Sequence, residues 1–187
     1  NGGDTATVTL TVTPVNDAPV GTDASAFGAE DTAITGTISA TDVDGDTLSY
    51  TLASGPANGS VTLTGNGYTY TPSADFNGTD SFDVLIDDGN GGTDTVTIEV
   101  TVTSVNDAPV GTDGSASGAE DTAITGTISA ADVDGDTLSY TLASGPANGS
   151  VTLTGNGYTY TPAADFNGTD SFDVLIDDGN GGTDTVT

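Results

Sequence analysis

The chain has 187 residues, of which 28 are acidic and none is Lys, Arg, His, Cys, Met or Trp. A formal charge of -28 at pH 7 repels phosphate backbones and anionic lipid, which argues against nucleic-acid partners and membrane-surface binding. Without His, Cys or Lys, the chain cannot build a Ser-His-Asp triad, a thiol nucleophile, a Schiff base or a His-ligated zinc site. A glycosidase with paired carboxylates is the one enzyme class left, and acids on exposed loops do not form its cleft. We therefore expect no enzymatic activity.

No apolar run approaches the ~20 residues of a membrane span, and no basic segment followed by an apolar one opens the chain. We therefore expect no direct membrane insertion and interpret the chain as a soluble interior segment of a longer protein. The absence of Cys means that disulfides do not stabilise it. Another interaction must offset the repulsion among the acids.

An internal repeat divides the chain. The segment from Asn16 recurs 90 positions later from Asn106, and only four of the 82 comparable residues differ, at positions 24/114, 27/117, 41/131 and 73/163. Residues 4–15 correspond to 94–105, the end of a repeat. We therefore predict three parts: residues 1–15 as the last strand of a preceding repeat plus linker, 16–105 as a complete repeat, and 106–187 as a second repeat without most of its last strand.

Apolar and polar residues alternate with period two along the repeat, which is typical of half-buried strands. We predict strands at 22–28, 33–40, 47–53, 60–64, 67–71, 80–87 and 94–103. On the last two strands, Phe82, Val84 and Ile86 share one face, and so do the apolar residues of 96–102. Seven short strands without helical periodicity indicate an all-β fold, a Greek-key β-sandwich of immunoglobulin-like type, with the repeats arranged end to end.

The acidic residues fall in loops that an up-and-down strand order sorts to two ends of each sandwich. One end receives Asn16, Asp17, Asp42, Asp44, Asp46, Asp87 and Asp88, and the other receives Glu30, Asp31, Asp75, Asn77, Asn106 and Asp107. Stacking the repeats head to tail would bring Glu30, Asp75, Asn77, Asn106 and Asp107 against Asp132, Asp134, Asp136 and Asp178. Such a set of oxygen ligands, with no basic partner, favours Ca²⁺ over the smaller Mg²⁺.

The sharpest local motif is Asp42-Val43-Asp44-Gly45-Asp46, repeated at 132–136. It begins like an EF-hand loop but departs from one, because its sixth position is Thr47 and its twelfth is Ala53. A solvated turn is the alternative reading of this loop. Of the neighbouring acids Asp87 and Asp88, we favour Asp88 as a ligand because it is in phase with Ile86, whereas we expect Asp80 to accept hydrogen bonds.

These residues together resemble the cadherin repeat pattern: Glu30, then Ala40-Thr41-Asp42-Val43-Asp44-Gly45, then Phe82 to Gly89, and finally Val105-Asn106-Asp107-Ala108-Pro109. More narrowly, the chain resembles the cadherin-like tandem repeats of giant bacterial surface adhesins of the VCBS and RTX type. The resemblance implies an extracellular, secreted or cell-surface location and several Ca²⁺ ions at each junction between repeats. It implies as ligands Glu30, Asp75, Asn77, Asn106, Asp107, Asp132, Asp134 and Asp178. The linker is one residue shorter than the cadherin form, and Ser104 stands where an acid is expected.

The leading functional hypothesis is a calcium-rigidified spacer in a long adhesin, whose partners are the neighbouring repeats of the array. A first alternative is a filament assembled by strand donation, in which residues 5–13 complete repeat two of a neighbouring chain. A second is homophilic or carbohydrate-binding adhesion through carboxylates and tyrosines.

Overall fold

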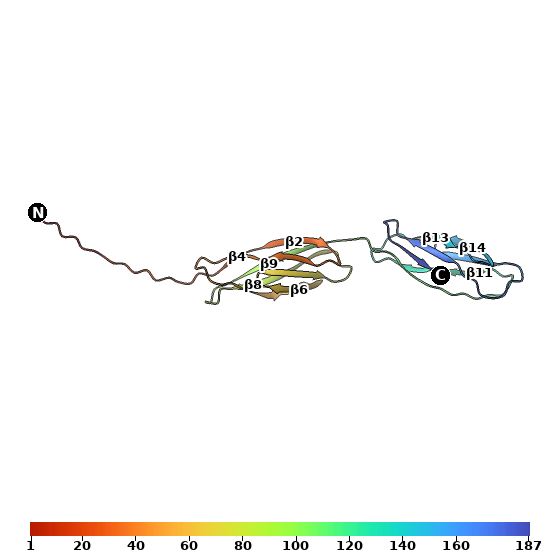
Figure 1. The fold of residues 1–187 in the computed structure, drawn as a ribbon, viewed down its shortest axis with the longest axis horizontal. Helices are drawn as coiled ribbons and strands as arrows, with labels where there is room; N and C mark the ends of the chain where they lie inside the picture. Colours follow the sequence, from red (N-terminus) through yellow and green to blue (C-terminus); the bar gives the residue numbers. More distant parts are fainter. The chain divides into compact units, whose positions relative to one another are not determined.

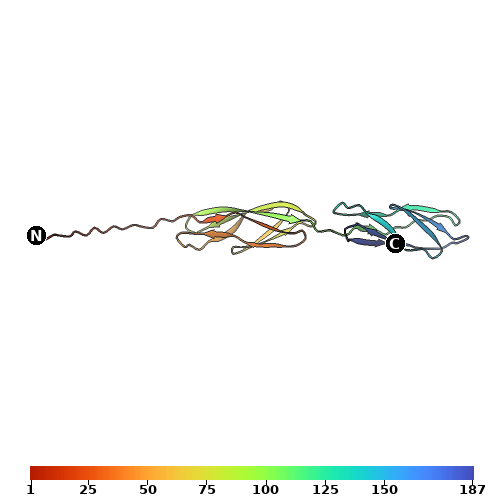
Figure 2. The same cartoon turned by 90° about the horizontal axis from the view of Figure 1, so that it is seen from above.

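Alternating apolar residues of the first repeat form two sheets that enclose a core. A computed structural model describes all 187 residues and divides them into two units, residues 1–104 and 105–187, which we call unit 1 and unit 2. Figures 1 and 2 show that the strands of each unit lie in two layers. The strands of unit 1 are β1 (Val20–Thr22), β2 (Ala24–Ala29), β3 (Ile34–Thr37), β4 (Ser39–Thr41), β5 (Ser49–Ser54), β6 (Gly59–Thr64), β7 (Gly67–Pro72), β8 (Gly78–Asp87) and β9 (Thr93–Thr103).

One layer of unit 1 is the four-stranded sheet β2-β9-β8-β5, and the other is the three-stranded sheet β3-β7-β6. Strands β1 and β4 form a separate antiparallel pair. The pairing of β2 with β9 is parallel, whereas the other pairs are antiparallel. The predicted all-β sandwich is confirmed.

The core of unit 1 lies between the two sheets. Tyr68 and Tyr70 of β7 are buried against Phe82 of β8, and the Tyr68 and Phe82 rings meet edge to face with centroids 5.2 Å apart. Edge-to-face contact is one of the two arrangements that the aromatic quadrupole favours. Every apolar residue predicted on the inner faces of β8 and β9 is buried: Phe82, Val84, Ile86, Val96, Ile98, Val100 and Val102.

The single strand predicted at 33–40 is wrong, since the chain forms two strands there. Strand β3 pairs with β7, whereas β4 pairs with β1. Between them, the buried Ile38 donates its backbone N–H to the carbonyl of Asn66 at 2.8 Å. The chain therefore changes sheets at Ile38, a step that leaves the period-two pattern intact and so leaves no trace in the sequence. The other six predicted strands agree with the structure to within two residues at each end.

Unit 2 has eight strands: β10 (Val110–Thr112), β11 (Ile124–Thr127), β12 (Ser129–Ala131), β13 (Ser139–Ser144), β14 (Gly149–Thr154), β15 (Gly157–Pro162), β16 (Asp173–Asp177) and β17 (Thr183–Val186). They form the sheets β13-β16-β17, β11-β15-β14 and β10-β12. Residues 114–119, which correspond to β2, form no strand, and β16 covers only the second half of the β8 counterpart. The core of unit 2 is correspondingly smaller.

Residues 1–19, expected to include the last strand of a preceding repeat, precede β1 and form no strand. A strand needs a neighbour that satisfies its backbone N–H and C=O groups, and no segment of the structure pairs with these residues. The structure contains no helix long and apolar enough to span a membrane.

Candidate metal centre

The Asp42–Asp46 loop of unit 1 holds three carboxylates close together. Gly45 adopts a positive φ of 80°, a conformation that glycine accepts readily, and it turns the loop back on itself. Oδ1 of Asp42 accepts the backbone N–H of Asp44 at 2.8 Å and that of Asp46 at 3.3 Å. Oxygens from these three carboxylates lie within 4.8 Å of one another. The loop therefore gathers negative charge instead of dispersing it.

The linker before β1 and the loop after β8 close around these carboxylates. The backbone N–H of Asp17 donates to Oδ2 of Asp44 at 2.8 Å, and Nδ2 of Asn16 donates to Oδ2 of Asp88 at 2.9 Å. We call the set Asn16, Asp17, Asp42, Asp44, Asp46 and Asp88 the entry cluster. Sequence analysis missed one member of this region: Nδ2 of Asn90 donates to Oδ2 of Asp46 at 2.9 Å. In the sequence, Asn90 lies in a Gly-Asn-Gly-Gly segment, which predicts a turn but gives no sign of a contact with Asp46.

Asp88 organises the loop that carries it. It is only 4% exposed, and its two oxygens accept the backbone N–H groups of Asn90 and Gly92 in addition to the amide of Asn16. The hydrogen bond from Asn16, followed by those from the loop, holds the pKa of Asp88 below its usual range against the opposing effect of burial. Asp88 is thus ionised and fixed in place, and its coordination of a metal stays a prediction.

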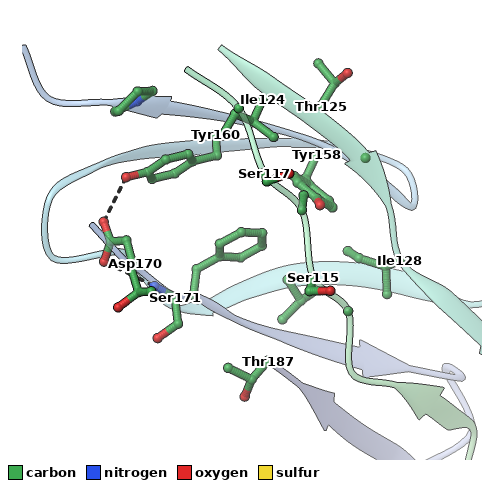
Figure 3. A pocket seen from close by; sticks show the side chains of 18 of the residues that line it. Ser115, Ser117, Ile124, Thr125, Ile128, Tyr158, Tyr160, Asp170, Ser171 and Thr187 are labelled. Atoms are coloured by element: carbon green, nitrogen blue, oxygen red, sulfur yellow. Dashed lines mark hydrogen bonds between the residues drawn. The ribbon is translucent and has the colours of Figure 1, made fainter. Parts of the chain in front are cut away.

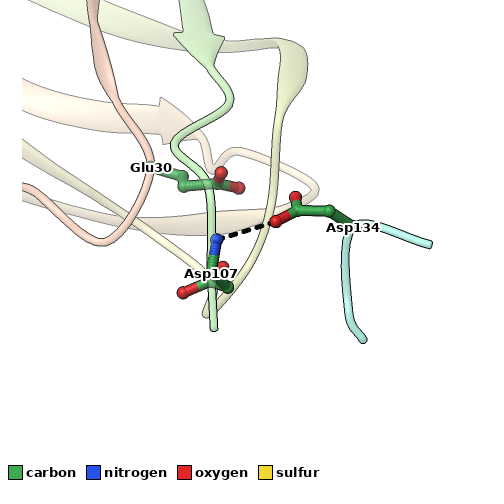
Figure 4. A group of neighbouring side chains, drawn as sticks. All are labelled: Glu30, Asp107 and Asp134. Atoms are coloured by element: carbon green, nitrogen blue, oxygen red, sulfur yellow. Dashed lines mark hydrogen bonds between the residues drawn. The ribbon is translucent and has the colours of Figure 1, made fainter. Parts of the chain in front are cut away.

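Unit 2 repeats the same arrangement with Asn106, Asp107, Asp132, Asp134, Asp136 and Asp178. Figure 4 shows the backbone N–H of Asp107 donating to Oδ2 of Asp134, at 2.8 Å. Nδ2 of Asn106 donates to Asp178 at 2.8 Å and lowers its pKa, as Asn16 does for Asp88. Carboxylate oxygens of Asp132, Asp134 and Asp136 again lie within 4.8 Å of one another. The entry cluster is therefore a property of the repeat.

A second acidic group, which we call the exit cluster, consists of Glu30, Asp31, Asp75 and Asn77 in unit 1. Glu30 is buried, with 3% of its surface exposed, and its Oε2 accepts Nδ2 of Asn77 at 3.4 Å. The backbone N–H of Asp75 donates to Oδ1 of Asp31 at 3.2 Å. Asp31 and Asp75 have positive φ angles of 55° and 56°. The sequence placed Asp31 in the turn at this end of the sandwich, but Asp31 was not among the predicted metal ligands.

The entry cluster fits a calcium ion. One oxygen of Asp42 and one of Asp132 are buried without a hydrogen-bond partner, although buried acceptors are nearly always paired. In each cluster, two carboxylate charges within 4.8 Å of each other repel by about 3 kcal/mol at an effective dielectric constant near 20. The chain supplies no Lys, Arg or His to neutralise them. Ca²⁺ accepts several oxygens from carboxylates, amides and carbonyls in irregular geometry, so these residues suit it better than Mg²⁺.

Asp80 belongs to a different network and was correctly expected to accept hydrogen bonds. Burial alone would raise its pKa, but N–H groups of Ala57, Asn58 and Ser81 and the Tyr70 hydroxyl outweigh burial and lower it. The Tyr70 hydroxyl donates to Asp80 at 3.1 Å, and burial followed by this bond raises the pKa of Tyr70 to about 12. The pair fastens the β5–β6 turn to the core.

Replacing Tyr70 with Phe should therefore change the alkaline stability of unit 1. Below pH 10 the variant should be less stable by about 1–3 kcal/mol, because Asp80 loses a buried donor. A tyrosine pKa raised from 10.0 to about 12 contributes stability that is full below pH 10 and is lost as the pH rises through 12. Urea unfolding of the two proteins between pH 8 and 12 should give free energies that converge. Parallel curves would contradict this assignment.

Comparisons with known proteins bear on the fold. A family model described as "Bacterial Ig domain" matches residues 16–101 and 106–187. Cadherin-23 repeats EC22–24 from mouse superpose with a TM-score of 0.59 at 16% identity, covering 92% of this chain and 65% of that one. Human mucin-like protocadherin EC1–2 gives a TM-score of 0.53 at 20% identity, covering 90% and 94%.

An endo-fucoidan hydrolase of glycoside hydrolase family 107 also matches, with a TM-score of 0.41 at 25% identity, and the chain spans 29% of its length. A TM-score this low gives no information about enzymatic activity. The chain spans about half of a protocadherin gamma B2 fragment, 51% of its length. No curated protein matches the chain. These likenesses establish two tandem sandwiches of the immunoglobulin and cadherin-like kind.

Proposed function

Because the chain belongs to the bacterial Ig domain family, whose members are typically parts of surface or secreted proteins, we propose that it is an extracellular spacer module stiffened by Ca²⁺. One observation carries the proposal. Each entry cluster holds a buried carboxylate oxygen with no hydrogen-bond partner, in a chain that has no basic side chain. A divalent cation would bind the unpaired oxygen and would also neutralise the repulsion among the carboxylates.

The two clusters of unit 1 lie at opposite ends of its long strand β8. Asn77 of the exit cluster immediately precedes β8, and Asp88 of the entry cluster immediately follows it. A strand of ten residues spans about 30 Å, so the two clusters lie far apart within the unit. In a head-to-tail array, the exit cluster of one unit would therefore meet the entry cluster of the next.

We propose that several Ca²⁺ ions bind where such clusters meet. The ligands would be Glu30, Asp75, Asn77, Asn106 and Asp107 together with Asp132, Asp134, Asp136 and Asp178. Ions held by both units would restrict bending of the linker, whereas unneutralised carboxylates would repel one another and favour bent or extended arrangements without fixed geometry. The near-identity of the repeats supports a spacer, because a spacer requires length and not a distinctive binding surface.

The role follows from this stiffening. We propose that the module extends a long secreted or cell-surface adhesin and holds a distal binding domain away from the cell, as an extender of the kind found in biofilm adhesins. The fold is consistent with a non-enzymatic, structural role, since the chemistry-bearing residues are carboxylates on loops at the ends of the sandwich.

A calcium titration of the intact chain tests the proposal. Small-angle X-ray scattering and calorimetry are measured in EGTA and then up to about 10 mM CaCl₂, a range that covers the ~10⁻⁴–10⁻³ M dissociation constants of extracellular calcium modules. In Ca²⁺ we expect scattering that fits one particle shape instead of a distribution of shapes, and a higher melting temperature. MgCl₂ should have little effect on either. Identical profiles in EGTA and Ca²⁺ would overturn the proposal, and equal effects of Mg²⁺ would reduce it to general charge screening.

A further inference from the structure

The repeat carries asparagine followed by glycine at four places, and the structure holds these pairs with very different firmness. In unit 1 they are Asn58-Gly59, Asn66-Gly67, Asn77-Gly78 and Asn90-Gly91. Such a pair can lose ammonia, because glycine has no Cβ to keep its backbone nitrogen away from Cγ of the asparagine. Proximity favours the five-membered ring that results, since the two atoms belong to adjacent residues. The freedom of each asparagine to move then decides which pair reacts.

The first pair is fixed to the core. The carbonyl of Asn58 accepts the Tyr70 hydroxyl at 3.2 Å. Unit 2 repeats this contact between Asn148 and Tyr160 at 3.1 Å, and the Tyr160 hydroxyl also donates to Asp170, as Figure 3 shows. Closing the ring at Asn58 would require this network to open.

Two further asparagines are each held by two hydrogen bonds. Asn66 donates Nδ2 to the carbonyl of Ile38 at 3.3 Å, and its own carbonyl accepts the Ile38 N–H at 2.8 Å. Asn90 donates its backbone N–H to Asp88 at 2.7 Å and its Nδ2 to Asp46 at 2.9 Å. Rotation of either residue into the ring geometry would break these bonds.

Asn77 is the least restrained of the four. It lies in the exposed loop before β8, and its one hydrogen bond runs from Nδ2 to Oε2 of Glu30 at 3.4 Å, longer than most N–H···O bonds. Gly78 is exposed as well and has a φ of 134°, a conformation that other residues rarely adopt. A side chain held by one long bond in an exposed loop changes conformation at low cost in free energy.

We propose that Asn77 is a site of spontaneous deamidation, and that the product makes the exit cluster of unit 1 depend on a bound cation. The backbone nitrogen of Gly78 attacks Cγ of Asn77 and forms a bond to it. The Cγ–Nδ2 bond breaks, and ammonia leaves with the proton of the Gly78 N–H. Water then opens the ring at one of its two carbonyls. This leaves aspartate or isoaspartate at position 77, and the ammonia takes up the acid proton as ammonium.

The new carboxylate would face a buried acid. Nδ2 of Asn77 donates to Glu30, whose side chain is only 3% exposed. Deamidation replaces this donor with a negative charge, and the chain has no basic side chain to place between the two carboxylates. A cation from solution can bind both. This consequence rests on the calcium proposed for the same cluster, whereas the deamidation itself does not.

Incubation of the full chain in EGTA at mildly alkaline pH tests the reaction. Peptide mapping by mass spectrometry in isotopically heavy water measures conversion at each asparagine, because the label enters only newly formed carboxyl groups. We expect position 77 to convert about 10-fold or more faster than position 66, since one ordinary hydrogen bond already accounts for a factor of that size. Asn77→Gln, which would need a six-membered ring, should stay unmodified. Equal conversion at positions 77 and 66, or none at 77, would overturn the proposal.

Two matched substitutions test the dependence on a cation. Asn77→Asp reproduces the charge of the product, and Asn66→Asp makes the same change outside both clusters. Calorimetry should show that Asn77→Asp melts below the wild type in EGTA and recovers in excess Ca²⁺, so that its calcium-induced rise exceeds that of the wild type by about 5 °C or more. Asn66→Asp should rise as the wild type does.

The results separate this inference from the proposed function. If the wild type responds to calcium and Asn77→Asp responds no more strongly, the cation dependence is overturned and the spacer proposal stands. If neither protein responds, both are overturned together. Conversion at Asn77 is decided in EGTA by the mass spectra in either case.

Discussion

Replacing Asp132 with Asn should remove most of the calcium-induced rise in melting temperature and leave the melting temperature in EGTA unchanged or higher. The asparagine Oδ1 can still accept the N–H groups of Asp134 and Asp136, as the aspartate does at 2.9 and 3.4 Å. The buried unpaired oxygen and its charge are lost, so repulsion in the apo state falls while a metal ligand disappears. At about 100 times the dissociation constant, one site contributes about 2.7 kcal/mol. For a domain of this size that is a shift of about 10–20 °C.

Two variants serve as controls for Asp132→Asn. Glu99→Gln makes the same change of charge at an exposed position of β9 and should keep the full response to calcium. Asp42→Asn makes the same change in the entry cluster of unit 1, which has no exit cluster before it in this chain. If bound ions need both clusters, Asp42→Asn should reduce the response less than Asp132→Asn does. A loss as large for Glu99→Gln would show that net charge, and not coordination, governs the effect.

Unit 2 should unfold at a lower temperature than unit 1, although their sequences are nearly identical. The buried core of unit 1 includes Ile98, Val100 and Val102, whereas the buried core of unit 2 consists of Ile128, Val174, Ile176 and Val186. Burying three such side chains is worth about 5–9 kcal/mol, an upper estimate because the unfolded chain already shields part of them. Calorimetry in EGTA should resolve two transitions.

Two phenylalanines at equivalent positions assign these transitions. Phe82 is 1% exposed, whereas Phe172 is only partly buried. Phe82→Ala should lower the free energy of unfolding of unit 1, seen as the upper transition, by about 3–5 kcal/mol. This is the usual effect of removing a buried aromatic ring. Phe172→Ala should lower the free energy of unfolding of unit 2 by a smaller amount, because its ring is already partly exposed to solvent. A single transition, or equal effects of the two substitutions, would contradict the difference in packing.

The sequence by itself determined the repeat, the strand pattern and the sorting of acids to two ends. Period-two alternation is a direct imprint of the strand on the residues that face the core, so β8 and β9 could be predicted with their buried faces. The loop order of an up-and-down sandwich was enough to group Asp17 with Asp44 and Asn16 with Asp88, and the hydrogen bonds within unit 1 bring these residues together. The absence of any basic residue pointed to a metal as counter-charge.

Only the tertiary structure decided which carboxylate oxygens already accept hydrogen bonds and which segments form strands. Asp42 and Asp88 look alike in sequence, yet both oxygens of Asp88 accept hydrogen bonds, from its own loop and from Asn16, while one oxygen of Asp42 is buried without a partner. The same residues Gly-Thr-Asp-Ser-Phe form a strand at 78–82 and none at 168–172. The reason is physical: hydrogen bonds and strand pairing are made between segments far apart in the chain, so no local pattern records whether the partner is present.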